Sequence, residues 1–176
     1  MKAINIFILL MFLVGFCCCD DEENIHVEEE GPRRDYDINS TDPVKKIVSE
    51  FFFNTGKEFI VDPDSSDYLY NFAEKNGVKM YPVSDANRDY LLSTVQLIKS
   101  GFLDCYTTEF VKENFPYSVI IADTIYDTGT YLTPKIVDNI ARINYYGVNV
   151  AGKANLDLAE QKAFLALVHY DFFNTY

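Results

Sequence analysis

Apolar and polar positions alternate most regularly in residues 84–102, with the spacing of a helix. Leu91, Val95, Ile98 and Phe102 recur at intervals of four, three and four residues, while Arg88, Gln96 and Lys99 lie elsewhere on the helical wheel. This period places the four apolar side chains on one face of an α-helix, which is buried by packing against a core. The segment therefore predicts a long amphipathic helix.

Two further helices are predicted before and after this one. Residues 42–56 carry start and stop signals, with Asp42 as N-cap, Pro43 at the first helical position and Gly56 at the end. Residues 107–116 predict a short helix that stops before its closing proline.

Short apolar runs predict the strands. Residues 57–63 and 78–83 are brief runs that end near prolines, and they predict two short strands or extended segments. Residues 117–126 and 141–152 predict two buried strands, joined by a loop through 127–135.

The segment 155–173 predicts a C-terminal helix that Asn155 or Asp157 can cap. Its turns from Ala163 to Val168 are apolar almost all round, which is typical of a buried helix. The stripe expected to pack most tightly consists of Phe164, Leu165, Val168 and Phe172.

The closing residues of the same helix, up to Tyr176, offer no glycine cap and are expected to fray. Together the elements predict an α+β fold. It is a small mixed domain, with a short sheet packed on the long amphipathic helix and a buried C-terminal helix.

Residues 1–18 have the composition of a secretory signal. One lysine precedes an apolar run from Ile6 to Phe16, and cysteines follow it. The run has about 11 residues, whereas a membrane-spanning helix needs roughly 20. The segment therefore predicts a signal peptide rather than a membrane span.

The cysteines after this run resemble the lipobox of bacterial lipoproteins, in which a peptidase cuts before an acylated cysteine. Cys19 follows the small Cys18 and precedes Asp20, whereas Cys17 follows the bulky Phe16. We expect lipidation at Cys19, and a lipid anchor would hold the protein on a membrane. An ordinary signal peptide cleaved elsewhere is the alternative.

Residues 19–42 predict a lipidated, acidic and flexible tether. Residues 20–42 contain ten acidic residues and two arginines, in a chain whose net charge is −12. Such a stretch is too charged to bury a core. An acidic cluster directly after the lipidated cysteine resembles the export signal for the outer face of the outer membrane. The charge excludes a nucleic-acid partner, because the basic footprint is missing.

Residues 43–176 suffice for one domain with a core of its own. After removal of the signal, the acylated Cys19 and Cys105 are the two remaining cysteines, so no internal disulfide is expected. Cys105 is expected to be a small buried apolar residue. The Asp-Thr-Gly at 127–129 resembles half of an aspartic-protease site, but that chemistry needs two carboxylates, and an ordinary turn at Gly129 explains it.

The order of elements, the run FVKENFPYSVIIADTI at 110–125 and the strand NIARINYYGVNV at 139–150 resemble the substrate import-associated zinc metallohydrolase lipoproteins, a peptidase-like family. The resemblance covers 43–176, the upstream part of a longer family domain. It implies a partial zincin-like fold, a zinc cofactor and an outer-membrane nutrient import complex as partner.

In that family the buried helix carries a His-Glu-x-x-His motif, typically with another His just before it. The two His face one metal ion from successive turns, and the Glu polarises a metal-bound water. This chain has two histidines, His26 in the tether and His169. With His169 as the first ligand, Phe173 replaces the second His and Tyr170 replaces the Glu.

In the register that we prefer, His169 is the family's extra His. Tyr170 then replaces the first ligand, Asp171 the general base and Asn174 the second ligand. These positions form a degenerate motif without a pair of metal ligands. We therefore expect no metal site and no cofactor, in a surface lipoprotein that is non-catalytic.

Two alternatives remain open on the sequence. The chain is an N-terminal fragment of an active zinc metallopeptidase, or it is an unrelated surface lipoprotein that binds a glycan or a protein. Tyrosines near the predicted strands could stack on sugar rings, although strands favour tyrosine in any case.

Overall fold

A computed structural model describes residues 33–69, 77–129 and 133–176. The chain divides into two units between Asp35 and Tyr36, and the second unit contains every described helix and strand. The signal segment and the three cysteines Cys17–Cys19 lie outside the described residues. Within the described ranges, no helix has the length and apolar character needed to cross a membrane.

The fold is α+β, as the sequence predicts. Its elements are α2 (Pro43–Thr55), β1 (Glu58–Ile60), α3 (Ser65–Tyr68), β2 (Val78–Tyr81), η3 (Asp85–Tyr90), α4 (Leu91–Gly101), η4 (Leu103–Cys105), α5 (Thr108–Asn114), β3 (Ser118–Ala122), β4 (Thr124–Asp127), β5 (Lys135–Val137), β6 (Asn139–Ala141), β7 (Tyr145–Asn149), η5 (Lys153–Asn155) and α6 (Leu158–Thr175).

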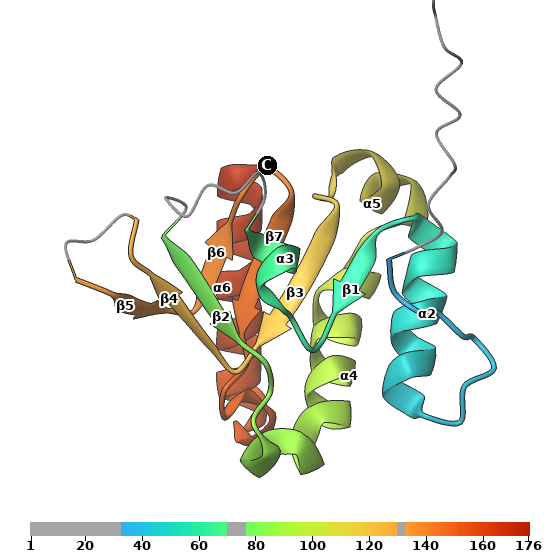
Figure 1. The fold of residues 1–176 in the computed structure, drawn as a ribbon, viewed down its shortest axis with the longest axis horizontal. Helices are drawn as coiled ribbons and strands as arrows, with labels where there is room; N and C mark the ends of the chain where they lie inside the picture. Colours follow the sequence, from blue (N-terminus) through green and yellow to red (C-terminus); the bar gives the residue numbers. More distant parts are fainter. Residues whose placement is uncertain (1–32, 70–76, 130–132) are drawn as a thin grey trace, which may run out of the picture. The chain divides into compact units, whose positions relative to one another are not determined.

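The strands form two sheets (Figure 1). The larger sheet has the order β1-β3-β7-β6, in which β1, β3 and β7 run parallel and β6 runs antiparallel to β7. Its register pairs Phe59 with Val119 and Val119 with Tyr146. The smaller sheet has the order β2-β4-β5 and is antiparallel.

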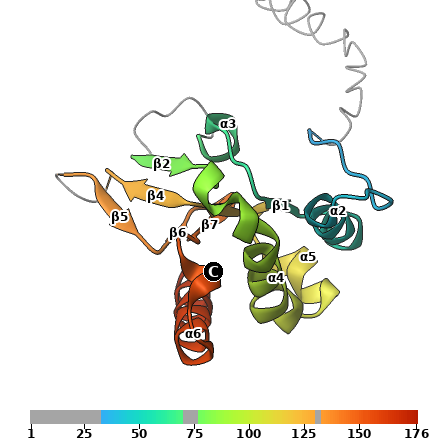
Figure 2. The ribbon, with the colours of Figure 1, turned by 90° about the horizontal axis from the view of Figure 1, so that it is seen from below.

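Strand β3 contributes to two hydrophobic cores, because successive side chains of a strand point to opposite faces. Val119 and Ile121 pack in the core formed with the helices, whereas Ile120 and Ala122 pack in the core formed with the smaller sheet. All five residues of β3 are buried. Figure 2 shows α4, α5 and α6 on one side of the larger sheet and β2 on the other. The unit is thus a layer of helices, a central sheet and a second sheet.

Helix α2 begins and ends at the predicted residues. The side chain of Asp42 accepts a hydrogen bond from the first turn, and Gly56 ends the helix with a left-handed φ of 68°. Upstream of the helix, the ring of Tyr36 stacks on Phe52 with centroids 4.1 Å apart. The folded unit therefore begins at Tyr36, earlier than the expected boundary at residue 43.

The predicted amphipathic helix is confirmed as α4, with Leu91, Val95, Ile98 and Phe102 buried. The segment in front of it, η3, is a 3₁₀-helix without a buried residue. The expected helix over residues 84–102 is thus two helical pieces of different kinds.

The predicted strand over 117–126 is two strands, β3 and β4, which belong to different sheets. They separate at Asp123, whose carboxylate accepts a hydrogen bond from Asn87 Nδ2 at 2.8 Å and faces the amide of Ser84 at 3.3 Å. These contacts hold the chain at the corner where it passes from one sheet to the other.

The predicted strand over 141–152 is one arm of a hairpin. Strands β6 and β7 pair antiparallel, with Ile140 opposite Gly147. Ile143 lies in the connection between them and is 92% exposed. The expected loop over 127–135 also includes the first residue of β5. Sequence periodicity missed these breaks because each is marked by only one to three residues, and apolar residues resume directly beyond it.

Helix α6 is buried on one face only, which corrects the expectation of a helix buried all round. Phe164, Val168 and Phe172 are 6%, 0% and 1% exposed, whereas Leu167 is 40% exposed. The expected fraying is also wrong: the helix continues to Thr175. The Tyr176 hydroxyl lies at hydrogen-bond distance from the carbonyl oxygens of Arg142 and Tyr145.

Candidate functional site on helix α6

Helix α6 carries all the residues that the sequence assigns to the degenerate motif. The side chain of Asp157 caps its start and accepts hydrogen bonds from the amides of Ala159 and Glu160. The carboxylate of Glu160 in turn accepts a hydrogen bond from the Asp157 amide. This capping box fixes the first turn. The apolar stripe through Val168 then fixes the rotation of the helix against the sheet, and with it the direction of each motif residue.

His169 is held by two protein groups. Its Nε2 lies 2.9 Å from the carbonyl oxygen of Gly101, and its Nδ1 lies 2.6 Å from the hydroxyl of Tyr106. A carbonyl oxygen can only accept, so Nε2 carries the hydrogen and donates it. Nδ1 is then the acceptor, and the Tyr106 hydroxyl donates to it. The contacts thereby fix the tautomer of the neutral ring.

The surroundings of this pair are aromatic. The His169 ring lies edge-on to Phe102 with centroids 5.2 Å apart, and Tyr106 stacks on Phe110 at 5.3 Å. Burial, with a smaller effect of the neighbouring Cys105, raises the pKa of Tyr106 to about 12. The hydroxyl therefore stays protonated and able to donate throughout the neutral range.

The other motif residues lie apart from a common centre. The Asp171 carboxylate accepts a hydrogen bond from Asn139 of β6. Tyr170 is 66% exposed, and Asn174 Nδ2 donates to the Tyr170 carbonyl at 2.9 Å within the helix. The structure thus brings neither Tyr170 nor Asn174 together with His169 at one point.

A zinc ion does not fit the residues present here. The Nδ1 lone pair of His169 accepts from Tyr106, and Nε2 carries a hydrogen, so neither nitrogen offers a free lone pair. Across the described ranges, no group of three or more His, Cys, Asp or Glu side chains is placed to hold a metal ion. We therefore derive no reaction step through a metal at α6.

Sequence reasoning missed the partners of this histidine. Gly101 ends α4 and Tyr106 follows η4, more than sixty positions upstream of His169. No spacing or motif signals a contact between segments so far apart. The partner of Asp171, Asn139, lies on an edge strand and was likewise invisible in the sequence.

Cys105 and Asp127, two other candidates from the sequence, differ in burial. Cys105 is exposed rather than buried, because η4 turns Leu103 inward and leaves the thiol outside. Asp127 is buried at the end of β4, where it accepts a hydrogen bond from the Gly129 amide at 2.9 Å and faces Arg142 at 3.9 Å. With these contacts the Asp127 carboxylate stabilises an ordinary turn.

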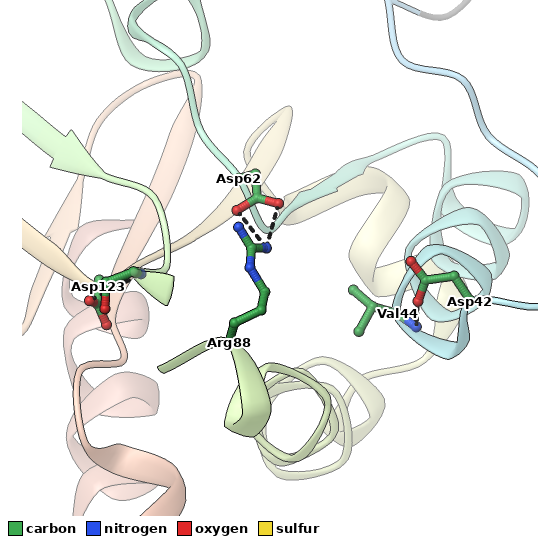
Figure 3. A network of polar contacts seen from close by, with 6 residues as sticks. Asp42, Val44, Asp62, Arg88 and Asp123 are labelled. Carbon is green, nitrogen blue, oxygen red and sulfur yellow. Dashed lines mark hydrogen bonds and ion pairs between the residues drawn. The ribbon is translucent and has the colours of Figure 1, made fainter. Parts of the chain in front are cut away.

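The carboxyl ends of the parallel strands are the usual place for a ligand in such a sheet. Figure 3 shows Arg88 reaching from η3 to Asp62, which follows β1, at 3.0 Å and 3.2 Å from its two carboxylate oxygens. Both side chains are about half exposed, so the pair contributes little to stability. Asp123, which follows β3, accepts a hydrogen bond from Asn87. The carboxylates of Asp62 and Asp123 are thus both engaged by protein groups.

A half-open cleft lies between α2, α4 and α5. Its cavity volume is about 110 Å³, and Glu50, Asn54 and Thr108 lie in its wall. On its rim, Lys99 contacts Asp104 at 2.7 Å. The cleft could accept a small polar ligand, but its wall carries no nucleophile paired with a base.

The tyrosines considered for sugar stacking are divided between core and surface. Tyr145 and Tyr146 are buried, and Tyr117 is 55% exposed. Tyr126 lies edge-on to Tyr81 on the smaller sheet. The described tyrosines therefore do not form one platform.

Comparisons of the chain with family models, with curated proteins and with solved structures give no match.

Proposed function

We propose that this protein is a non-catalytic relative of the substrate import-associated zinc metallohydrolase lipoproteins, and that its folded unit serves binding rather than hydrolysis. One observation carries the proposal: both ring nitrogens of His169 are engaged, by Gly101 and by Tyr106. A histidine in this state holds α6 against α4 and does not ligate a metal.

The replaced motif positions support the same proposal. In the preferred register Tyr170 and Asn174 stand for the two ligands, and neither has an imidazole. Asp171 keeps the acid of the motif, but its carboxylate accepts a hydrogen bond from Asn139. Without a metal-bound water, the Asp171 carboxylate has no activated nucleophile to deprotonate. The partial zincin-like fold remains part of the proposal.

We also propose that the chain is lipidated at Cys19 and faces the cell exterior on the outer membrane. The support comes from the sequence: an apolar run, three cysteines and the acidic residues 20–42 follow one another. An outer-membrane nutrient import complex is the setting that the resemblance implies. In that setting, a lipid-anchored unit would hold a ligand or a partner close to the membrane.

Elemental analysis of the purified chain tests the metal part of the proposal. After dialysis against a zinc-containing buffer and then a metal-free buffer, we expect less than a stoichiometric amount of zinc. The variant His169→Ala, with Asn174→Ala as its control, should leave the zinc content unchanged. One tightly held zinc ion per chain, lost in His169→Ala alone, would show that His169 is a ligand.

Metabolic labelling with a palmitate analogue tests the anchor. The parent chain should carry the label, and Cys19→Ala should lose it and accumulate the precursor. Cys18→Ala and Cys17→Ala are matched controls that should keep the label. Labelling retained in Cys19→Ala and lost in one of the controls would move the anchor to that cysteine.

Digestion of intact cells with an added protease tests the orientation. A chain that faces the exterior should be degraded while a periplasmic marker stays intact. Protection of the chain to the same degree as the marker would place it on the inner side of the outer membrane.

A further inference from the structure

The outward face of α6 is apolar where a surface helix normally carries charge. Ala159, Ala163, Ala166, Tyr170 and Phe173 follow one another at intervals of four, three, four and three residues, so they form one stripe along the helix. We call these five residues the α6 stripe. None of them is charged, and all of them are exposed.

The α6 stripe lies opposite the packed face of the same helix. Tyr170 and Phe173 are 66% and 60% exposed, whereas Val168 and Phe172 are almost fully buried. Figure 2 shows α6 as one flank of the layer of helices. Large exposed apolar surface on a folded unit is typical of an interaction site.

The α6 stripe divides into a small half and a large half. Its N-terminal half has the alanines Ala159 and Ala163, and its C-terminal half has the aromatic Tyr170 and Phe173. Ala166 lies at the middle. If two copies of α6 pair antiparallel about Ala166, the aromatic half of each helix covers the alanine half of the other. A two-fold axis then makes both halves of the contact identical.

A parallel pairing does not fit the same pattern. It would set the aromatic halves against each other and the alanine halves against each other. Helix axes pack 8–10 Å apart according to the side chains between them, so one distance cannot suit both halves. In the antiparallel arrangement, large faces small along the whole contact, as in a well-packed interior.

The available area suits a weak, reversible pair. An aromatic side chain offers roughly 150–250 Å², so Tyr170 and Phe173 each leave about 100–150 Å² to cover. The four aromatic side chains of two copies could then bury roughly 400–600 Å², to which the alanine methyl groups add, so the contact stays below about 1,200 Å², in the range of weak and transient interfaces. We propose that the α6 stripe is a homodimer interface in which two copies of this chain pair antiparallel about Ala166.

This proposal goes beyond the proposed function and does not depend on the lipid anchor. Confinement of anchored copies to a membrane would raise their effective concentration and favour a weak pair. The proposal also gives Tyr170 a role in place of the one that its motif position has lost.

Disulfide trapping tests the arrangement, because a covalent bond captures even a weak pair. The experiment uses the chain from Asp20 to Tyr176, which contains the folded unit Tyr36–Tyr176, with Cys105→Ser as background. Ala166→Cys should form a disulfide dimer under mild oxidation, since a disulfide needs Cα atoms within about 7 Å. Circular dichroism of each variant checks that it is folded.

The direction of the pair is tested by mixing two variants. Ala159→Cys and Asn174→Cys should cross-link with each other much faster than either does with itself. Ile143→Cys, an equally accessible position outside α6, is the control and should cross-link only at the background rate. Self-cross-linking of Ala159→Cys at the rate of Ala166→Cys would overturn the antiparallel arrangement.

Sedimentation velocity tests the pair without cross-links. The parent chain should increase in mass with concentration, and Tyr170→Glu should weaken association by about tenfold or more, because it replaces an aromatic contact residue by a charge that the contact would bury. Ile143→Glu should associate like the parent chain. A folded chain that stays monomeric and whose Ala166→Cys variant cross-links only at the Ile143→Cys rate would overturn the proposal.

Discussion

The hydroxyl of Tyr106 lies 2.6 Å from Nδ1 of His169, and this contact joins the segment after η4 to helix α6. The carbonyl of Gly101 takes the other ring nitrogen at 2.9 Å, so the imidazole bridges two turns of the chain that lie near the end of α4. A polar bridge in aromatic surroundings is strong while it is complete and costly when it is half removed.

We expect Tyr106→Phe and His169→Ala each to lower the free energy of unfolding. The first leaves Nδ1 without a donor and should cost about 1–3 kcal/mol. The second should cost at least as much, because it also removes ring contacts with Phe102. Urea denaturation of the two variants and of the double variant gives the coupling energy, which should be about 1 kcal/mol. A coupling energy near zero would contradict the hydrogen bond.

Substitution by alanine should destabilise the protein much more at Phe172 than at Phe173. Phe172 is 1% exposed and lies 4.5 Å from the ring of Phe115, whereas Phe173 is 60% exposed. Phe172→Ala should cost roughly 3–5 kcal/mol, since it leaves a cavity in the core. Phe173→Ala, its neighbour and control, should change stability by about 0.5 kcal/mol or less. Equal losses in chemical denaturation would mean that the rotation of α6 is wrong.

Tyr176 should stabilise the end of α6 through its hydroxyl. The oxygen lies 2.8 Å from the Tyr145 carbonyl and also contacts the Arg142 carbonyl. Tyr176→Phe keeps the ring, which packs 5.1 Å from Phe172, and removes the donor. We expect a loss of about 1 kcal/mol, measured by thermal or urea unfolding. No loss in Tyr176→Phe would contradict a contribution of these hydrogen bonds to stability.

Tyrosines with a raised pKa should make the fold sensitive to alkali. Burial raises the pKa of Tyr106, of Tyr145 and of Tyr176 from 10.0 to about 12. In the unfolded chain these hydroxyls ionise near pH 10, while the folded chain retains their protons. Between pH 10 and pH 12 the unfolded state therefore binds fewer protons, and stability falls as pH rises. Below pH 10 this contribution is fully present.

Urea denaturation across that range measures the effect. Tyr106→Phe should show a shallower decline of stability with pH than the parent chain, because one of the groups with a raised pKa is missing. A decline of the same steepness in both chains would contradict a raised pKa for Tyr106.

Two glycines with left-handed backbone should differ in their tolerance of alanine. Gly77 has φ 58°, and a Cβ there would lie 2.1 Å from the backbone nitrogen of Gly129. Gly56 has φ 68° and nothing within 4 Å of such a Cβ. Gly56→Ala should cost about 1–2 kcal/mol from backbone strain alone. Gly77→Ala should cost clearly more in the same unfolding assay, and an equal cost would contradict the close approach.

The sequence predicted those elements whose signals are local. The cap at Asp42, the stop at Gly56 and the apolar face of α4 all depend on residues within a few positions of one another. Of the apolar stripe predicted for the packed face of α6, Phe164, Val168 and Phe172 are buried for the same reason, whereas Leu165 is only partly buried. Such signals survive in a single sequence because propensity, capping and periodicity act within one helix.

The errors occurred where distant segments decide the structure. The break at Asp123 depends on Asn87 and Ser84, and the bridge at His169 depends on Tyr106 and Gly101. A single charged residue, Asp123, between two apolar runs does not tell whether the strand continues or turns a corner into another sheet. The expectation that α6 is buried all round also failed, because composition does not tell which faces find a partner.

The corner at Asp123 has a consequence for how the unit unfolds. The chain leaves the larger sheet at Ala122 and enters the smaller one at Thr124, so the two sheets are consecutive parts of one strand path. Because β3 supplies side chains to both cores, the smaller sheet cannot detach without exposing Ile120, and the helices cannot detach without exposing Val119. Loss of either layer exposes the apolar side chains on one face of β3 to solvent. The layers are therefore thermodynamically coupled: a substitution that destabilises one core also destabilises the other, because both cores share β3.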